Sequence, residues 1–287
     1  MLPQYLVREA VERALAEDIG RGDITTDALI DASVPASARL MAREQGIVAG
    51  LDLAEAAFRG VETRTHGQNT APDIVFERLI ADGRPVEAGD IIARISGSAR
   101  ALLSAERVAL NFMTHMSGIA SLTGRYVAAV AGTKARIVDT RKTLPGLRVF
   151  EKYAVRMGGG VNHRFALDDA AMIKDNHVVA AGGIGPAVRQ VKAVVGHMVK
   201  VCCEVDRIDQ IEDALEAGAD VLLLDNMDPE TLAEAVRLIA GRAVVEASGK
   251  VSLDTVSAIA ASGVDVISVG RLTHSAPVLD IALDFDD

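Results

Sequence analysis

The sequence predicts an α/β fold in which a barrel of alternating strands and helices follows a smaller α+β domain. Three observations predict it. In the second half of the chain, short apolar runs alternate with segments whose apolar residues have helical spacing. Glycines that end those helices recur at 218, 241 and 263, and the segments 217–221 and 262–266 are near copies. Strands that alternate with single helices form parallel sheets, and a repeat with such regular spacing favours closure of the sheet into a barrel.

Six strands are expected between residues 135 and 270, two fewer than in an ordinary TIM barrel. They are the segments 135–139, 171–174, 199–205, 221–224, 243–246 and 264–269. Asp206 is expected to cap the helix after the third strand, because Ile208, Ile211 and Leu215 follow it at helical spacing.

The first hundred residues predict a small α+β domain. An amphipathic helix is expected over 3–19, and short strands are expected over 38–43, 46–49 and 91–95. A long helix over roughly 99–116 joins this domain to the barrel. Arg107 falls on the polar stripe of that helix, so its position alone indicates a solvated surface residue.

Composition and charge narrow the possible functions. Hydrophobic residues make up 49% of the 287 residues and aromatic residues only 3%, so the core must be aliphatic, as in parallel sheets buried on both faces. The net charge of −10 argues against a general nucleic-acid binder. Cys202 and Cys203 are adjacent and have no other partner, which fits a reducing compartment. With no signal-peptide pattern and no apolar run long enough for a membrane span, we expect a cytoplasmic protein.

The residues that follow the expected strands form three chemical groups. In a parallel barrel, reactive side chains lie at the C-terminal ends of the strands and in the loops beyond them. The first group is cationic and comprises Arg141, Lys142, His163, Arg164 and Lys174, with Thr140 beside them. The second group is the acid pair Glu204 and Asp225. The third group consists of two late turns, Ser248-Gly249-Lys250 and Ser268-Val269-Gly270.

Each group suits a part of one kind of ligand. Arginine binds carboxylates and phosphates through paired hydrogen bonds, so several arginines together favour a polyanion. Carboxylates can hold sugar hydroxyls, bind Mg²⁺ or offset positive charge on a sugar ring. Glycine turns with free N–H groups bind phosphate in such barrels. The three groups together predict a pocket for a phosphorylated sugar and an anionic partner.

Each group also has a plainer interpretation. Arg141 and Lys142 could belong to a solvated loop, Glu204 could pair with Lys174 or Lys200, and His177 could cap the next helix. A structural role is also the commoner one for a single histidine such as His163. The prediction therefore depends on all of these residues meeting at one end of the barrel.

Several motifs at these strand ends resemble the quinolinate phosphoribosyltransferase family. They are Asp-Thr-Arg-Lys-Thr (139–143), Gly-Gly-Gly-Val-Asn-His-Arg (158–164), Met-Ile-Lys-Asp-Asn-His (172–177), Leu-Leu-Asp-Asn-Met (223–227) and Glu-Ala-Ser-Gly (246–249). Two earlier segments, 17–26 and 105–112, resemble the family as well. The resemblance implies a six-stranded incomplete α/β barrel over 115–274 and an N-terminal α/β sandwich domain over 1–114, to which the segment 275–287 returns.

The resemblance also implies roles for the site residues. Arg107, Arg141, His163 and Arg164 would bind the two carboxylates of quinolinate, with Arg107 reaching into the site of a second subunit. Lys142 and Lys174 would hold the pyrophosphate of phosphoribosyl pyrophosphate, and the glycine turns would bind its 5-phosphate. Glu204 and Asp225 would face the ribose hydroxyls and a Mg²⁺ ion, which the carboxylates would hold through water. The role of His274 is left open.

The implied reaction is phosphoribosyl transfer to quinolinate with decarboxylation, which gives nicotinate mononucleotide in NAD biosynthesis without an organic cofactor. The implied assembly is a homodimer with shared active sites, or a larger homo-oligomer. Two positions depart from the family pattern: Cys202 stands where the first glutamate of a Glu-x-Glu pair is expected, and Lys250 follows Ser-Gly where Gly or Asn is commoner. The alternatives are a paralogue with another acceptor, as in molybdenum operons, a Schiff-base aldolase using Lys174 or Lys200, and a non-catalytic anion-binding protein.

Overall fold

The computed structural model describes residues 2–65 and 72–286, without the side chains of residues 62–65. These residues form two compact units. The first unit comprises Met1–Leu122, Val149–Gly159 and Ser275–Asp287, and the second comprises Thr123–Arg148 and Gly160–His274. Compared with the domain limits proposed from the sequence, the first unit extends past residue 114 and also includes the segment Val149–Gly159.

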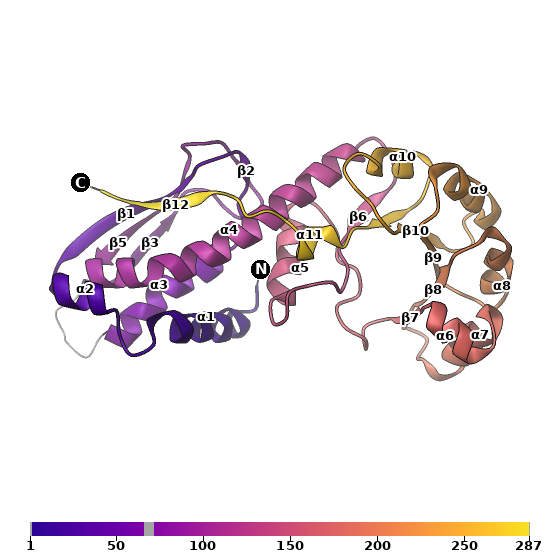
Figure 1. The fold of residues 1–287 in the computed structure, drawn as a ribbon, viewed down its shortest axis with the longest axis horizontal. Coiled ribbons are helices and arrows are strands. Elements are labelled where there is room, and N and C mark those ends of the chain that lie inside the picture. The colour runs from indigo at the N-terminus through magenta and orange to yellow at the C-terminus, as the bar shows by residue number, and fades with distance from the viewer. Residues whose placement is uncertain (1, 66–71, 287) are drawn as a thin grey trace. The chain divides into compact units, whose positions relative to one another are not determined.

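The first unit is a four-stranded antiparallel sheet with helices along one face (Figure 1). The strand order is β12-β1-β5-β3, and β2 and β4 form a separate two-stranded sheet. The strands are β1 Pro35–Ala42, β2 Gly46–Ile47, β3 Val75–Arg78, β4 Pro85–Val86, β5 Ile91–Ser98 and β12 Ile281–Phe285. The helices are α1 Gln4–Ile19, α2 Ile24–Leu29, α3 Leu51–Thr65, α4 Ala99–Ala129, which runs on into the second unit, and α5 Arg148–Met157.

Helix α4 is thirteen residues longer than the segment predicted from the sequence, 129 against 116 at its end. The apolar stripe continues past 116, because Ile119, Ala120 and Tyr126 are buried, and no proline interrupts it. Position 118 of this helix requires glycine, because a Cβ there would overlap the carbonyl oxygen of Pro277 and come within 2.9 Å of Val278 Cα. The glycine thus lets the returning C-terminal segment lie directly against α4, from where it runs into β12.

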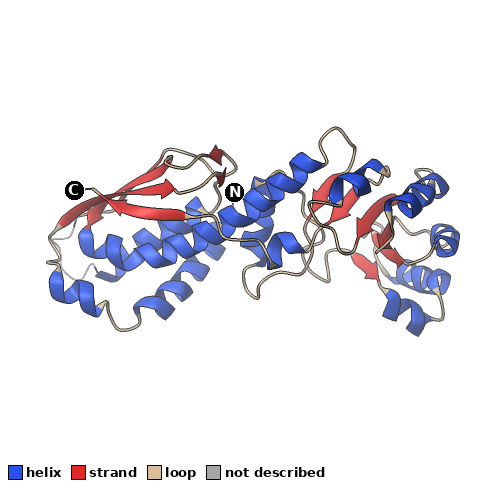
Figure 2. Ribbon diagram, turned by 45° about the horizontal axis from the view of Figure 1, so that its top comes forward, coloured by secondary structure: helices blue, strands red, loops and turns tan. Residues whose placement is uncertain are grey.

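The second unit is a curved parallel sheet with helices on its outer side (Figures 1 and 2). Its six strands, in the order β6-β11-β10-β9-β8-β7, confirm the predicted incomplete barrel: among the described residues, no strand pairing joins β6 to β7. The strands are β6 Arg136–Val138, β7 Ala171–Ile173, β8 Val201–Val205, β9 Val221–Asp225, β10 Val244–Ser248 and β11 Val266–Ser268. The remaining helices are α6 Asp175–Ala181, α7 Ile184–Val194, η1 Ile208–Gln210, α8 Ile211–Glu216, α9 Pro229–Ile239, α10 Val256–Ala261 and α11 Arg271–His274.

The near-copied segments 217–221 and 262–266 have a structural cause. In each, an aspartate just before a strand accepts a hydrogen bond from a backbone N–H in the first two residues of the neighbouring strand. Asp220 accepts from Val201 N–H at 2.8 Å, and Asp265 accepts from Val245 N–H at 2.9 Å. Lys192 pairs with the first carboxylate at 2.7 Å. The repeated aspartate therefore fixes the register of adjacent parallel strands.

Side chains alternate across the strands of this sheet, as the two-residue period of a β-strand requires. In β9, Leu222 and Leu224 are buried. Val221 lines a cavity near the N-terminal ends of the strands, and Asp225 lines another at their C-terminal ends. The core is aliphatic, as predicted, since leucine, isoleucine and methionine dominate its largest fully buried side chains. In the described part of the chain, no helix is long and apolar enough to span a membrane.

Candidate functional site

A cavity of about 360 Å³ lies at the C-terminal ends of the strands of the second unit. It gathers most of the residues that the sequence predicts there. Its lining is Thr140, Lys142, Asp225, Asn226, Ser248, Gly249, Lys250, Val251, Ser268, Val269, Gly270, Arg271 and His274. We call it the upper cavity. The lining includes both glycine turns, one lysine of the cationic group and one member of the acid pair.

Two glycines give the upper cavity its shape. Gly249 has φ +91°, and a Cβ there would overlap the amide side chain of Asn226 and lie 2.8 Å from its backbone nitrogen. At Gly270, a Cβ would lie 3.1 Å from Lys142 Cδ and 3.3 Å from His274 Nε2. Because each glycine lacks a side chain, the turns after β9 and β10 pack together, and Lys142 and His274 approach the start of α11. Backbone N–H groups in such turns suit a phosphate group.

Three carboxylates meet beside this cavity. Oxygen atoms of Glu204, Asp206 and Asp225 all lie within 4.8 Å of one another. Lys174 Nζ is 2.6 Å from Glu204 Oε2, which confirms the ion pair considered from the sequence. A compact set of carboxylate oxygens is the donor set that Mg²⁺ prefers, so these residues fit a divalent cation.

Asp206 is the acidic residue that the sequence interpretation missed. It was expected to cap a helix, and that expectation is wrong. The helical segment begins with η1 after Arg207, and Gln210 Oε1 accepts the hydrogen bonds from the backbone N–H groups of Asp206 and Arg207. The Glu-x-Asp spacing at the end of β8 was the available signal, because residues two apart in a strand face the same side.

The loop after β6 and the segment before β7 bring two arginines together. Burial and then the nearby cation of Arg141 lower the pKa of Arg164, so the two guanidinium groups are close enough to repel each other. Arg141 Nε is buried and has no hydrogen-bond partner among the described residues. An anion bound between these arginines would relieve both the repulsion and the missing hydrogen bond.

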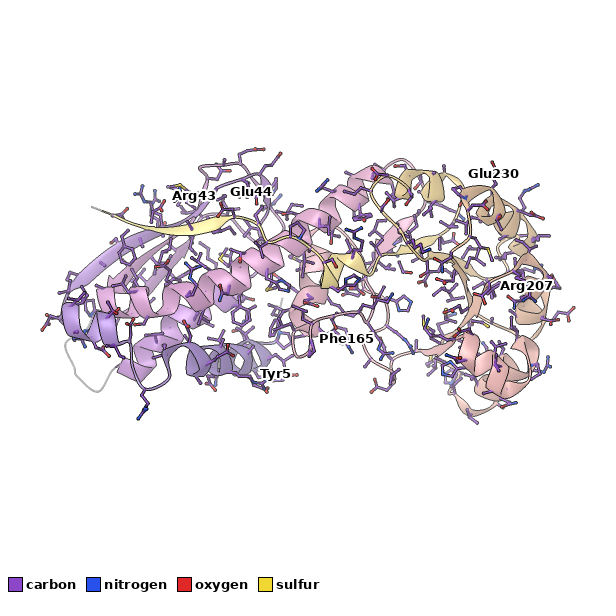
Figure 3. The ribbon with its side chains drawn as sticks, viewed as in Figure 1. Tyr5, Arg43, Glu44, Phe165, Arg207 and Glu230 are labelled. Atoms are coloured by element: carbon purple, nitrogen blue, oxygen red, sulfur yellow. The ribbon has the colours of Figure 1, made fainter. Side chains whose placement is uncertain are left out.

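Arg148 connects these two segments to each other, a role that was not predicted from the sequence. Its guanidinium donates to Thr143 Oγ1 at 3.0 Å, to the carbonyl of Phe165 at 3.1 Å and to the carbonyl of Arg141 at 3.4 Å. Figure 3 shows Phe165 on the segment that precedes β7. Arg148 thus fixes the loop that carries Arg141 relative to the segment that carries Arg164.

His163 and Arg164 line a second cavity, of about 340 Å³, which we call the lower cavity. It also includes Cys202, Glu246 and the strand-initial valines 221, 244 and 266. Cys202 therefore lies below the acid cluster and is not among the residues that line the upper cavity. Burial and the Glu246 carboxylate raise the pKa of its thiol, whereas Arg164 and Lys174 act in the opposite direction. Cys202 lines this cavity together with Arg164 and lies two residues before Glu204 in β8, so the lower cavity adjoins the strand that carries part of the acid cluster.

Two further sequence interpretations have structural answers. His177 Nδ1 accepts a hydrogen bond from Lys174 N–H at 2.9 Å, so His177 caps α6, as its plainer interpretation held. Arg107 belongs to the first unit, has a side chain that is 64% exposed, and pairs only weakly with Glu106 at 3.4 Å. Both cysteines are free thiols.

Comparison with known proteins gives one family over nearly the whole chain. Residues 23–117 match the family model of the quinolinate phosphoribosyl transferase N-terminal domain, and residues 119–284 match the C-terminal domain model. The chain is 43% identical over 282 residues to the nicotinate-nucleotide pyrophosphorylase [carboxylating] of Mycobacterium leprae, covering 96% of each chain. It is 39% identical over 278 residues to the probable enzyme of that name from Bacillus subtilis, covering 97% of this chain and 93% of the relative.

Solved structures agree with this assignment. The nicotinate-nucleotide pyrophosphorylase of Francisella tularensis has a TM-score of 0.93 and 36% identity, over 100% of this chain and 98% of that one. The NadC structure from Streptococcus pyogenes has the same TM-score at 40% identity, over 100% of this chain and 99% of that one. The chain therefore belongs to the quinolinate phosphoribosyltransferase family.

Proposed function

We propose that this protein transfers the phosphoribosyl group of phosphoribosyl pyrophosphate to quinolinate and releases carbon dioxide. The products are nicotinate mononucleotide and pyrophosphate, and the pathway is NAD biosynthesis. The observation that carries the proposal is the meeting of a glycine-turn cradle, an acid cluster and an arginine pair in one barrel. The names of relatives that match nearly the whole chain support the same reaction.

The arginine pair accounts for recognition of the acceptor. Quinolinate carries two carboxylates on adjacent ring carbons, and Arg141 and Arg164 supply two guanidinium groups close to each other. Such pairs form parallel hydrogen bonds with a carboxylate. In the part of the chain that the structure describes, the buried Arg141 Nε has no hydrogen-bond partner, and an acceptor carboxylate can provide one.

The upper cavity accounts for recognition of the sugar. The 5-phosphate lies against the turns at Ser248-Gly249 and Val269-Gly270, where it can accept hydrogen bonds from the N–H groups of the two glycines, since Val269 N–H already donates to the Val138 carbonyl. Glu204 and Asp225 face the ribose hydroxyls. These two residues and Asp206 would hold Mg²⁺, which neutralises charge on the pyrophosphate when bound.

The reaction then follows from charge placement. As the bond from ribose carbon 1 to pyrophosphate breaks, positive charge develops on the sugar ring, and the quinolinate nitrogen attacks that carbon from the opposite face. Lys142 and Lys174 stabilise the departing anion, and Glu204 and Asp225 offset the ring charge. Carbon dioxide then leaves the ring carbon next to the pyridinium nitrogen, and the positive nitrogen stabilises the electron pair that remains on that carbon. A proton then binds this carbon in place of the lost carboxylate.

We further propose a cytoplasmic homodimer in which Arg107 completes the acceptor site of the other subunit. Its side chain is largely exposed, and it forms an ion pair with its neighbour in sequence, Glu106. Mixing two inactive variants tests this. When Arg107→Ala and Lys174→Ala chains are refolded together in equal amounts, about half of the dimers are mixed, and each mixed dimer holds one intact site. The mixture should therefore regain about a quarter of the wild-type active sites. A mixture as inactive as its components would argue against shared sites.

The rival reactions fit the geometry less well. A Schiff-base aldolase needs a neutral lysine amine. Lys174 Nζ is held by Glu204 at 2.6 Å, and Lys200 pairs with Asp220 at 3.5 Å. A non-catalytic anion-binding protein would have no use for the acid cluster. A paralogue with another acceptor shares the sugar site, so it is separated from our proposal by an acceptor assay.

The test is direct. Purified protein is mixed with phosphoribosyl pyrophosphate, Mg²⁺ and quinolinate labelled in the 2-carboxylate, with nicotinate as the control acceptor. We expect nicotinate mononucleotide and labelled carbon dioxide in equal amounts from quinolinate alone. Turnover of nicotinate only, or no turnover of either, would overturn the proposal.

A further inference from the structure

Glu246 is a buried acid that the proposed reaction does not use. It lies in the middle of β10, two residues before Ser248, and is only 3% exposed. Its Oε2 is 3.3 Å from His163 Nε2. Its Oε1 is buried and has no hydrogen-bond partner among the described residues. A buried polar group is costly without a hydrogen bond, so the contact with His163 Nε2 stabilises this side chain.

The imidazole of His163 is held on both sides. Nδ1 accepts a hydrogen bond from the backbone N–H of Arg164 at 2.7 Å, so the ring proton of neutral His163 is on Nε2, which faces Glu246. The backbone N–H of His163 donates to Asp139, at the end of β6, at 2.9 Å. The ring therefore links a strand of the barrel wall to the backbone of Arg164.

We propose that Glu246 is a positioning residue that acts through His163 to set the orientation of Arg164. The Glu246 carboxylate fixes the ring, the ring fixes the Arg164 amide, and the Arg164 side chain is thereby held near Arg141. Its other anchor is the carbonyl of Ala170, to which Nη1 donates at 2.8 Å. In this arrangement both ring nitrogens of His163 face protein groups, so His163 serves acceptor binding by holding Arg164.

The kinetic part of the test rests on the proposed function. Glu246→Leu keeps the volume but removes the acceptor for Nε2–H, whereas Glu246→Gln keeps an acceptor oxygen. We expect Glu246→Leu to raise the KM for quinolinate about tenfold or more, Glu246→Gln to raise it only a few-fold, and both to change the KM for phosphoribosyl pyrophosphate less than about twofold. Equal rises for both substrates would overturn the proposal.

A matched control separates positioning from the general cost of breaking a buried pair. Glu151 in the first unit is fully buried and lies 3.0 Å from His115 Nε2, so it forms a second pair of the same type. Glu151→Leu should lower the unfolding temperature, as Glu246→Leu does, without the selective rise in the KM for quinolinate. In a His163→Leu background, Glu246→Leu should add no further rise, and an additive effect would contradict action through His163.

A measurement without turnover tests the same inference. Nitrogen-15 NMR of the six histidines, with His163→Gln to identify the signal, reports which ring nitrogen of His163 carries the proton. We expect a single Nε2–H form in the wild type and in Glu246→Gln, and a mixture of forms in Glu246→Leu. If the wild type shows Nδ1–H, or if Glu246→Leu leaves the signals unchanged, the inference fails. If quinolinate is not turned over but the NMR result holds, only the proposed function fails.

Discussion

Removing the charged end of Arg141 should weaken binding of a dicarboxylate and, without ligand, make the protein more stable. Arg141→Met is the suitable change, because methionine keeps the apolar stem and removes the guanidinium group. Two unfavourable features of the ligand-free protein disappear with it. One is the buried Nε, which has no partner within residues 2–65 and 72–286, and the other is the repulsion that, with burial, lowers the pKa of Arg164.

The magnitudes follow from those features. A buried polar group without a hydrogen bond costs about 1–3 kcal/mol, and some of this gain is offset by lost solvation of the charge, so we expect a net stabilisation of about 1 kcal/mol. That corresponds to a rise of about 2–4 °C in the unfolding temperature of a chain of this size. A hydrogen bond to a charged group contributes about 1.5–3 kcal/mol, so quinolinate binding should weaken about 10- to 150-fold.

Calorimetry measures both effects. Scanning calorimetry gives the unfolding temperature without ligand, and titration calorimetry gives the affinities for quinolinate and phosphoribosyl pyrophosphate. Arg148→Met is the control, since Arg148 donates three hydrogen bonds and its loss should lower the unfolding temperature. An unfolding temperature that falls in Arg141→Met as much as in Arg148→Met, with quinolinate affinity unchanged, would refute the reasoning.

Two other predictions concern the sheet and the phosphate turns. Burial opposes ionisation of Asp220, but hydrogen bonds from Lys192 and from the Val201 N–H outweigh burial and lower the pKa of the carboxyl group. The ionised carboxylate therefore stabilises the fold above about pH 4, and this stabilisation is lost as the pH falls through the folded-state pKa. Asp220→Asn should therefore cost about 1 kcal/mol in urea unfolding at pH 7 and nothing at pH 2, and an equal cost at both would contradict the ion pair. Gly249→Ala forces a Cβ into Asn226 at φ +91°, so the KM for phosphoribosyl pyrophosphate should rise about tenfold or more while quinolinate affinity, measured by titration, stays within about twofold. Unchanged kinetics would show that this turn does not hold the phosphate.

Much of the barrel could be predicted from the sequence because its signals are local. The apolar runs and the glycines after helices depend on neighbouring residues, and the six strands of the second unit lie where those patterns indicate. The strands β3 and β12 were missed for a physical reason. Three of the four residues of β3 are exposed, which leaves it without an apolar alternation, and β12 pairs with β1, whose residues are more than 200 positions away.

The site could be predicted in part. Strand-end residues such as Asp225 and Ser248 share the upper cavity because parallel strands end at one edge. The roles of Asp206, Arg148 and Glu246 depend on contacts between distant segments. Arg148, for example, bonds to a carbonyl seventeen residues later in the chain. Such contacts leave no spacing pattern in a single sequence, so the groups that position the reactive residues are found only in the fold.

A structure of the protein with quinolinate and an unreactive analogue of phosphoribosyl pyrophosphate tests the central claim most directly. Our account predicts the acceptor carboxylates at Arg141 and Arg164, the 5-phosphate at the turns of Gly249 and Gly270, and the ribose hydroxyls at Asp225. A ligand bound away from the C-terminal ends of the barrel strands, or a phosphate at the arginine pair with the acceptor elsewhere, would contradict it.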